Sequence, residues 1–356
     1  MSGIGVAIVG CGYWGANLIR NFWELEEAQL LLACDLDAKL LERTRRRYPT
    51  LELTRDYGEI LSHPRVDAVV LATPVSTHYP FAREALRAGK HVLVEKPLAR
   101  TSSEALDLMD VAERNRVTLM VDHTFLYTGA VRRMKELIDS GGIGDLLYYD
   151  SVRINLGLVQ SDVSVLWDLG PHDFSIMDYL CERDSVSVSA IAARHLNCPF
   201  ENIAYVTVRF DSRLIAHFHL NWLAPLKVRM TLIGGSKKMI VYDDMQPSEK
   251  VKVYDKGITV NHDPERRARL LTGYRNGDML APQLDTHEAL RLMAREFCCS
   301  ISENRPSLTS GYMGYRVVRL LEAAQHSAQQ GGREIELASP TIPPTHGLAA
   351  GTPART

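Results

Sequence analysis

The chain has 356 residues, of which 46% are hydrophobic and 24% charged, and its formal net charge is −2. At this length a single hydrophobic core is unusual, so we expect two domains with a ligand site in the cleft between them. The small net charge supplies no basic field for nucleic acid or anionic lipid. No apolar run approaches the roughly 20 residues of a membrane helix. We therefore expect a globular protein with a small-molecule partner and neither a nucleic-acid nor a membrane partner.

The cysteines form no C-x-x-C pair and show no metal-ligand spacing with histidine. They are Cys11, Cys34, Cys181, Cys198, Cys298 and Cys299. Isolated cysteines of this kind are typical of free thiols in a reducing compartment. The amino terminus lacks a basic segment followed by an apolar secretory core. We expect a cytoplasmic protein without a metal site.

Short apolar runs alternate with amphipathic stretches from Ile4 to Val121, the pattern of a parallel sheet with crossover helices. The predicted strands are Ile4–Val9, Leu30–Cys34, Asp67–Ala72, His91–Val94 and Val117–Val121. The predicted helices are Asn17–Glu26, His78–Ala88 and Ser103–Asn115. Several strands are continuously apolar, as expected where helices cover both faces of a sheet. Residues 1–122 are therefore predicted to form a doubly wound α/β domain of the Rossmann type.

The segment Gly10-Cys11-Gly12-Tyr13-Trp14-Gly15 follows the first predicted strand and opens the first helix. In a Gly-x-Gly-x-x-Gly turn the first glycine permits the tight turn and the second lets the backbone approach a pyrophosphate. The third glycine lets the helix pack closely on the strand, and the helix amino terminus attracts the phosphates. The glycine turn thus predicts a dinucleotide site.

Asp35 ends the second predicted strand, 20 residues after Gly15. A carboxylate there accepts hydrogen bonds from the adenosine ribose hydroxyls, which favours NAD over NADP. A 2′-phosphate would place negative charge beside Asp35 unless a cation intervened. The sequence offers such cations on the following helix, although basic residues also suit a solvated helix end. They are Arg43, Arg45, Arg46 and Arg47.

Glu95-Lys96-Pro97 follows the strand His91–Val94, at the sheet edge where ligands of open α/β folds bind. The proline restricts Lys96 to extended backbone geometry, so the lysine is held in place. A plain surface lysine is the alternative. The position favours a functional role for Lys96.

After about Asp122 the pattern changes to one helical stretch, Val131–Ser140, followed by strands separated by turns. Alternating apolar and polar residues predict a mainly antiparallel open sheet with one covered face, in residues 123–335. Its strands are expected at Tyr205–Phe210, Leu214–Asn221, Val228–Ile233, Met239–Tyr242 and Val251–Tyr254, and two late helices, Thr286–Ser302 and Tyr312–Ala328, complete this domain. Residues 336–356 are rich in Pro, Gly and Ala and are expected to be a disordered tail.

Asp168 and His172 lie four residues apart in Trp-Asp-Leu-Gly-Pro-His-Asp-Phe, on one face if the segment is helical. An imidazole that titrates near neutrality is the usual proton acceptor in alcohol oxidation, and a carboxylate can orient it. Pro171 makes the helical spacing uncertain if the helix begins near Gly170. Asp173 is the alternative carboxylate.

Weaker candidates for substrate binding lie elsewhere in the chain. Arg153 and Asn155 share one face of a predicted strand, where a sheet-surface role is the alternative. Tyr274 and Arg275 lie in a Gly- and Pro-containing stretch that suits a flap or an oligomer contact, and His123 suits either the cleft or a hinge. His217 and His219 alternate on a strand without a nearby third ligand, which argues against a metal site.

These motifs resemble the Gfo/Idh/MocA family, named for glucose–fructose oxidoreductase and inositol dehydrogenase. The resemblance spans roughly residues 3–335 through GCGYWGANL, ATPVSTHYPFAREALRAGKHVLVEKPLA, the Asp-x-x-x-His segment and GGSKKMIVYDD. It implies a catalytic lysine at Lys96 and an aspartate–histidine pair at Asp168 and His172. It also implies cofactor contacts from the motif residues Gly10, Gly12, Tyr13, Trp14, Gly15, Asp35, Thr73, Pro74, His78, Glu95 and Lys96.

The resemblance implies an NAD-dependent oxidoreductase that exchanges a hydride with a carbinol or ketone carbon of a sugar. The segments YWGANLIRNF and YRNGD are most similar to members acting on nucleotide-linked sugars, such as at C3 of a nucleoside diphosphate hexose. A free sugar or inositol is the alternative substrate, and a catalytically inactive NAD(P)-sensing protein is the alternative class. An uncovered sheet face predicts a homodimer or homotetramer joined through the second domain.

Overall fold

The computed structural model describes residues 3–156, 162–260 and 272–337. Its contacts divide the chain into two compact units. The first unit contains the described residues up to Thr124 together with 288–319, and the second contains those from Phe125 to His287 together with 320–337. The predicted disordered tail falls almost wholly on residues 338–356, which lie outside the described residues.

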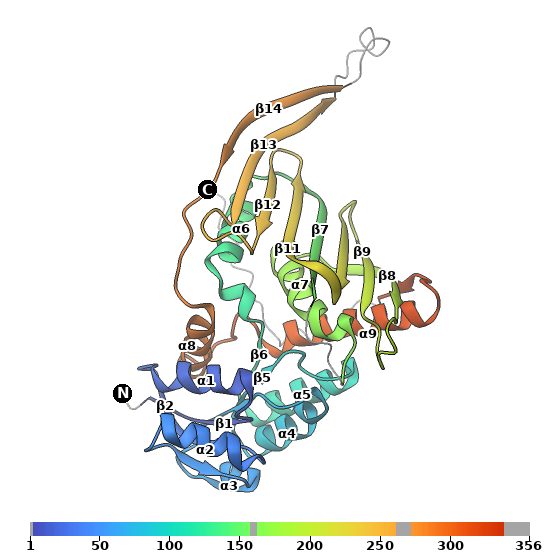
Figure 1. The fold of residues 1–356 in the computed structure, drawn as a ribbon. Helices are drawn as coiled ribbons and strands as arrows, with labels where there is room; N and C mark the ends of the chain where they lie inside the picture. The colour runs from blue at the N-terminus through green and yellow to red at the C-terminus, as the bar shows by residue number, and fades with distance from the viewer. Residues whose placement is uncertain (1–2, 157–161, 261–271, 338–356) are drawn as a thin grey trace. The chain divides into compact units, whose positions relative to one another are not determined.

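The first unit is built on a six-stranded sheet whose neighbouring strands are all parallel, in the order β3-β2-β1-β4-β5-β6. The strands are β1 (Ile4–Val9), β2 (Ala28–Cys34), β3 (Glu52–Thr54), β4 (Ala68–Leu71), β5 (His91–Glu95) and β6 (Leu119–Asp122). The central strands are apolar and almost completely buried because helices cover both faces of the sheet (Figure 1). This confirms the predicted Rossmann-type sheet and adds the short β3, which the sequence analysis did not predict.

Helices connect successive strands of this sheet. They are α1 (Tyr13–Trp23), α2 (Ala38–Arg47), α3 (Tyr57–Ser62), α4 (Val75–Arg87) and α5 (Ser102–Asn115). Several begin at a side chain that accepts a backbone N–H: Asp37 caps α2, Asp56 caps α3 and Thr101 caps α5. Each cap sets the residue at which its helix begins. The caps therefore set the lengths of the loops at the carboxyl edge of the sheet.

The late helix α8 (Ala289–Ser302) belongs to the first unit, whereas the sequence analysis assigned it to the second domain. The rings of Phe297 on α8 and Phe22 on α1 meet edge to face, 6.5 Å apart. The first half of α9 (Gly311–Gln329) also belongs to this unit, and the Val121 N–H donates to the Thr309 carbonyl just before that helix. Residues distant in sequence therefore complete the first core, which a reading in chain order could not reveal.

The second unit is built on a nine-stranded sheet in the order β14-β13-β12-β11-β7-β10-β9-β8-β15. Every neighbouring pair is antiparallel except β7 and β10, so the sheet is mixed but mostly antiparallel. The strands are β7 (Leu146–Leu156), β8 (Ser185–Ala193), β9 (Ile203–Phe210), β10 (Ile215–Asn221), β11 (Leu223–Gly235), β12 (Met239–Asp243), β13 (Val251–Val260), β14 (Thr272–Leu280) and β15 (Ile335–Glu336).

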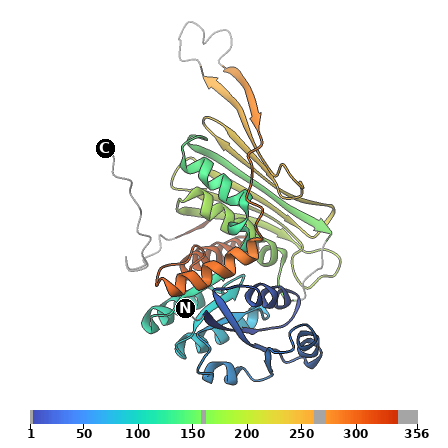
Figure 2. The same ribbon diagram turned by 90° about the vertical axis from the view of Figure 1, so that its left-hand side faces the viewer.

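Helices cover one face of this large sheet, as Figure 2 shows for the green α6 (Gly129–Asp139) and α7 (Val165–Cys181). The short η1 (Thr124–Tyr127) precedes α6. Strand residues alternate between buried and exposed, and Val206, Phe218 and Val188 all lie on the covered face. The strands β13 and β14 extend beyond the other strands as a long hairpin (Figure 1). Tyr274 and Arg275, whose stretch suits a flap or an oligomer contact from sequence, therefore lie on strand β14.

Candidate functional site

The glycine turn joins β1 to α1 in the first unit. Gly10 has a φ of +94°, and a Cβ placed there would lie 2.4 Å from the Ala72 carbonyl oxygen. A Cβ on Gly15 would lie 1.8 Å from the Gly10 carbonyl oxygen, so both positions require glycine. A Cβ on Gly12 would meet nothing within 4 Å. The turn therefore presents open backbone at the amino terminus of α1, which fits the pyrophosphate of a dinucleotide.

Asp35 lies directly after β2, and backbone donors hold its carboxylate. The Cys11 N–H donates to Oδ2 over 2.6 Å and the Asp37 N–H donates to Oδ1 over 2.8 Å. The first bond ties the carboxylate to the glycine turn itself. Two N–H donors leave lone pairs on both oxygens, because each carboxylate oxygen can accept more than one hydrogen bond. Asp35 is thus a preoriented acceptor that fits the ribose hydroxyls of NAD.

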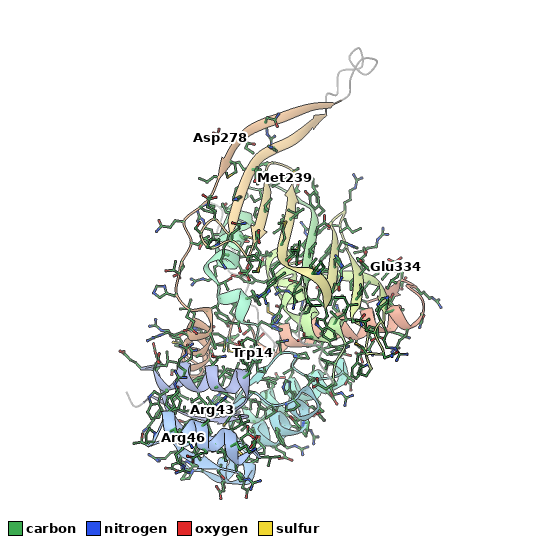
Figure 3. The ribbon with its side chains drawn as sticks, in the orientation of Figure 1. Trp14, Arg43, Arg46, Met239, Asp278 and Glu334 are labelled. Carbon is green, nitrogen blue, oxygen red and sulfur yellow. The ribbon has the colours of Figure 1, made fainter. Side chains whose placement is uncertain are left out.

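Arg43 and Arg46 lie on α2, the helix that follows Asp35 in the chain (Figure 3). One Nη atom of Arg43 lies 3.5 Å from the Cys11 carbonyl oxygen, and Arg46 pairs with Glu42 over 3.1 Å. Both line a surface hollow together with Ala38, Lys39 and Glu42. Arg43 therefore reaches the glycine turn. Arg46 is exposed in the last turn of α2, as expected for a solvated helix end.

Tyr13 and Trp14 open α1 and expose much of their rings, 76% and 47% respectively. The two rings meet edge to face at 5.3 Å. Exposed aromatic rings beside open backbone are unusual in a folded domain unless a ligand or partner covers them. Their predicted cofactor contacts stay a prediction.

His78 on α4 contacts the loop that follows β4 and the loop that follows β5. Its ring nitrogens lie 2.8 Å from the carbonyl oxygens of Pro97 and Thr73. Burial lowers the pKa of His78, and the charge of Lys96 lowers it further, although the two carbonyl contacts act in the opposite direction. Pro74 occupies the N-cap position of α4 between these contacts. His78 thus positions the loop that carries Lys96.

Lys96 follows β5 at the carboxyl edge of the sheet, the same edge that carries the glycine turn. The backbone N–H of Lys96 donates to Glu95 Oε2 over 3.2 Å. The Glu95 carboxyl is buried, and its register partner is Asp122 at the end of β6. The charge of Lys96 acts on Glu95, Asp122 and the buried His123. Lys96 is therefore close to a group of buried ionisable side chains.

The second unit places Asp168 and His172 on α7. This helix begins at Val165, six residues before Pro171, and the Asp168 N–H donates to the Ser164 carbonyl over 3.0 Å. The structure thus removes the uncertainty that the proline introduced, because both residues are helical and share a face. Most of α7 is buried, while Asp168 and His172 are partly exposed.

The indole of Trp222, which is only 1% exposed, donates from Nε1 to Asp168 Oδ2 over 3.2 Å. Trp222 lies between β10 and β11, and its own backbone N–H donates to the Asn202 carbonyl. A buried indole N–H needs an acceptor, and the carboxylate supplies it. The sheet therefore holds one oxygen of Asp168 through a residue that no sequence motif indicated.

Asp173, the alternative carboxylate, is committed to another partner. Arg153 on β7 donates to it from Nε over 2.9 Å and from Nη2 over 2.8 Å, with both side chains at most 5% exposed. Breaking such a buried pair by removing one partner typically costs about 3–5 kcal/mol. The pair joins α7 to the sheet beside His172. Asp173 is therefore a structural residue, and a substrate contact of Arg153 stays a prediction.

Phe125 lies between cations and the imidazole of His172. Its ring centroid is 4.7 Å from Arg153 Cζ and 5.8 Å from Arg229 Cζ. The His172 ring meets it edge-on at 5.0 Å with an interplanar angle of 67°. Arg153 and Arg229 are register partners on β7 and β11, and Arg229 pairs with Asp244 over 3.3 Å. His172 therefore contacts an aromatic ring, and the two arginines on that ring are each paired with an aspartate.

The remaining candidates for substrate binding are Arg275, Tyr274 and Asn155. Arg275 donates from Nε to Asp255 over 2.9 Å and so links β14 to β13. The side chain of Tyr274 lies outside the described residues. Asn155 is half-buried on β7. Among the described residues, no group of three His, Cys, Asp or Glu side chains is placed to hold a metal ion.

The candidate residues fall into two groups, one in each unit. The first unit brings together the glycine turn, Asp35, His78, Lys96 and His123, while the second brings together Asp168 and His172. No sequence motif indicated Asp122, Phe125 or Trp222 as site residues. Asp122 could have been found, because it directly follows the predicted strand Val117–Val121, whereas the contacts of Phe125 and Trp222 have no local signal. Within the described residues, no helix has the length and apolarity to cross a membrane.

Two models of one protein family match the chain. Residues 4–123 match the model described as an oxidoreductase family with an NAD-binding Rossmann fold, GFO_IDH_MocA. Residues 131–241 match the GFO/IDH/MocA C-terminal domain. The matches cover both groups of candidate residues.

Curated relatives match part of the chain. Glycosyl hydrolase family 109 protein 2 of Shewanella sp. (strain ANA-3) is 31% identical over 44% of this chain and 36% of its own length. Inositol 2-dehydrogenase 2 of Saccharopolyspora erythraea is 31% identical over 53% of this chain and 57% of its own length. The chain thus spans roughly a third of the first relative's length and under three fifths of the second's.

Solved structures match nearly the whole chain. GenD2 from gentamicin A biosynthesis, in complex with NAD, has a TM-score of 0.81 at 23% identity and covers 95% of this chain and 97% of its own. A putative oxidoreductase from Magnetospirillum magnetotacticum MS-1 has a TM-score of 0.78 at 29% identity and covers 90% and 99%. UDP-N-acetylglucosamine 3-dehydrogenase GnnA from Acidithiobacillus ferrooxidans has a TM-score of 0.79 at 20% identity and covers 93% and 99%. The shared fold therefore extends through both units.

Proposed function

Because the chain belongs to the Gfo/Idh/MocA family of oxidoreductases, we propose that it is an NAD-dependent dehydrogenase acting on a sugar or sugar nucleotide. The reacting centre in this proposal is a secondary alcohol or ketone carbon. The observation that carries the proposal lies in the first unit, where the glycine turn after β1 and Lys96 after β5 share the carboxyl edge of one parallel sheet. Ligands of open α/β sheets bind at that edge.

In this proposal Lys96, Asp168 and His172 act on the same carbinol. NAD, when bound, supplies the hydride acceptor, and its reduced form supplies the donor. Lys96 donates a hydrogen bond to the reacting oxygen and stabilises its alkoxide character. His172 takes or returns the hydroxyl proton. Asp168, with one oxygen held by Trp222, orients the imidazole.

A nucleotide-linked hexose is the substrate we favour, with oxidation at a ring carbon such as C3. One fold neighbour is a UDP-N-acetylglucosamine 3-dehydrogenase. The cations around Phe125 also support an anionic substrate, because Arg229 lies near His172 through that ring and keeps about a third of its side chain exposed. A free inositol or sugar is the second candidate, supported by the inositol 2-dehydrogenase among the relatives.

Turnover assays test the proposal. The purified protein is incubated with NAD and a panel of UDP-, dTDP- and GDP-hexoses beside inositols and free sugars, and NADH formation is followed by absorbance. We expect NADH formation with at least one nucleotide sugar. Turnover of inositol alone would favour the second candidate. Binding of NADH without turnover across the whole panel would instead favour a cofactor-sensing protein of the same fold.

We also propose a homodimer or homotetramer formed through the open face of the second unit's sheet. On that face Ile191, Tyr205 and His219 are register neighbours across β8, β9 and β10. Ile191 is 63% exposed and Tyr205 44% exposed, and the Tyr205 ring stacks on His219 at 4.5 Å. Contiguous apolar exposure on a sheet is characteristic of an interaction surface.

A further inference from the structure

We propose that Glu95 and Asp122 hold one proton between them at neutral pH, so that the pair presents a single negative charge to Lys96. This charge offsets the positive charge of Lys96, which acts on both carboxyls. Lys96 is then a hydrogen-bond donor, and the proton-acceptor role falls to His172. Both carboxyls are thereby assigned as positioning groups that act through Lys96.

The sheet register brings the two carboxyls together. Glu95 and Asp122 are partners in the parallel pairing of β5 and β6, and each is the last residue of its strand. Residues paired in this way point to the same side, so their side chains lie next to each other. Glu95 is 8% exposed and Asp122 2% exposed. Two carboxylates are therefore adjacent in a place that water hardly reaches.

Adjacent buried carboxylates cannot both remain ionised at low cost. Burial raises the pKa of Glu95 well above its usual value and the charge of Asp122 raises it further, while Lys96 opposes the shift. Burial also raises the pKa of Asp122. A hydrogen bond between two carboxyl groups requires a proton on one of them, because an ionised carboxylate has no donor.

The surroundings indicate that Glu95 carries the proton and Asp122 the charge. The hydroxyl of Thr124 donates to Asp122 Oδ1, and the Thr124 backbone N–H also donates to this carboxylate. Such donors stabilise the ionised form. Glu95 accepts a longer bond, over 3.2 Å, from the Lys96 N–H. Asp122 Oδ2 is buried and accepts a hydrogen bond from no donor among the described residues, so it can accept a proton donated by Glu95.

The other titratable groups near Lys96 do not cancel this charge. Burial lowers the pKa of His78, and it lowers the pKa of His123 to about 3, so both rings are neutral at pH 7. Lys96 and the pair with one proton then form a neutral set. A buried site of this kind is far less costly than one with an uncompensated charge.

The test is competitive labelling of Lys96 with trace acetic anhydride as a function of pH, read by mass spectrometry. It compares the wild type with Glu95→Gln, Asp122→Asn and the double variant. Amide replacements keep the shape of the side chains. Glu95→Gln retains the ionised Asp122, so we expect the midpoint pH of Lys96 labelling in this variant to stay near the wild-type value. The double variant loses the negative charge, and we expect its midpoint to fall by roughly one to two pH units.

Other charge states give different patterns. If both carboxyls were ionised, each single variant would lower the midpoint and the two effects would add. If both were protonated, the double variant would leave the midpoint unchanged. Either pattern overturns the proposal. The exposed Lys39 provides the internal control, because its labelling should be the same in all four proteins.

A second measurement covers the case in which the double variant does not fold. Infrared spectroscopy of the wild type at pH 7 should show the carbonyl band of a protonated carboxylic acid that Glu95→Gln removes. Absence of that band would contradict the shared proton. The inference deepens the role proposed for Lys96, but both experiments read protonation alone. Their outcome is therefore separate from whether the protein turns over any substrate.

Discussion

The indole N–H of Trp222 donates to Asp168 across 3.2 Å, which connects the strand region after β10 to the helix that carries His172. Replacing Trp222 with Phe removes this donor and keeps an aromatic ring. We expect NAD binding to persist while turnover falls by about tenfold, the equivalent of one hydrogen bond to a charged group. Steady-state kinetics and NADH titration measure the two effects.

Trp167→Phe is the matched control for this prediction. Trp167 lies on α7, the helix that carries Asp168, and donates a hydrogen bond from its indole to Gln325. The chemical change and the burial are similar, with Trp167 9% exposed. This variant should lose stability but keep its turnover. Equal turnover losses in both variants would mean that the indole of Trp222 acts only through stability.

Lys96→Ala and His172→Ala should each lower turnover by at least about a hundredfold, the range for positioned acid–base and hydrogen-bonding groups. Cofactor binding should stay nearly intact, as measured by NADH fluorescence. If the two groups act on one carbinol, the double variant should lose little more than the worse single variant, because residues that act as a unit are not additive. Wild-type rates in both single variants would refute the assignment.

Asp35→Ala should weaken NAD binding by about tenfold or more while affecting NADP less. The loss reflects hydrogen bonds between the carboxylate and the ribose hydroxyls, and the removal of negative charge favours a 2′-phosphate near Arg43. Asp37→Ala is the control, since its side chain caps α2 by accepting the Lys39 N–H. The control should cost about 1 kcal/mol of stability and leave the NAD to NADP ratio unchanged.

His123 should make the protein sensitive to mild acid. Burial lowers its pKa in the folded state to about 3, with a further contribution from the charge of Lys96. Above pH 6.5 the ring is neutral in both states and contributes no pH dependence. Between pH 6.5 and 3 only the unfolded chain binds a proton on His123. The free energy of unfolding therefore decreases as the pH decreases, by about 2 kcal/mol at pH 5.

Urea unfolding at pH 7.5 and pH 5 checks this expectation. His123→Gln should lose about 2 kcal/mol less than the wild type between the two pH values. His217→Gln, which replaces an exposed histidine on the open face of the sheet, should behave like the wild type. Identical acid sensitivity in the wild type and His123→Gln would show that His123 does not titrate as described.

The open sheet face of the second unit should hold an oligomer together. Light scattering of the wild type should give a mass of at least two protomers. Ile191→Asp introduces a charge at the most exposed apolar residue of the patch and should shift the mass toward one protomer. Leu36→Asp, at a similarly exposed leucine of the first unit, should leave the mass unchanged. A wild-type mass of one protomer would contradict the proposed assembly.

The sequence by itself determined the elements whose signals are local. The glycine turn, the strand ends at Asp35 and Glu95, and the helical spacing of Asp168 and His172 all depend on neighbouring residues, and the structure places them as predicted. Continuous apolar strands likewise predicted the parallel sheet, because only strands covered on both faces tolerate such runs.

The tertiary structure alone decided which distant residues meet. The packing of Phe297 on α8 against Phe22, the bond from Trp222 to Asp168 and the pairing of Arg153 with Asp173 join residues between 20 and 275 positions apart. Such contacts follow from packing, which no local periodicity encodes. The same holds for Glu95 and Asp122, whose shared burial arises from strand register and turns two ordinary carboxyls into one proposed proton-holding pair.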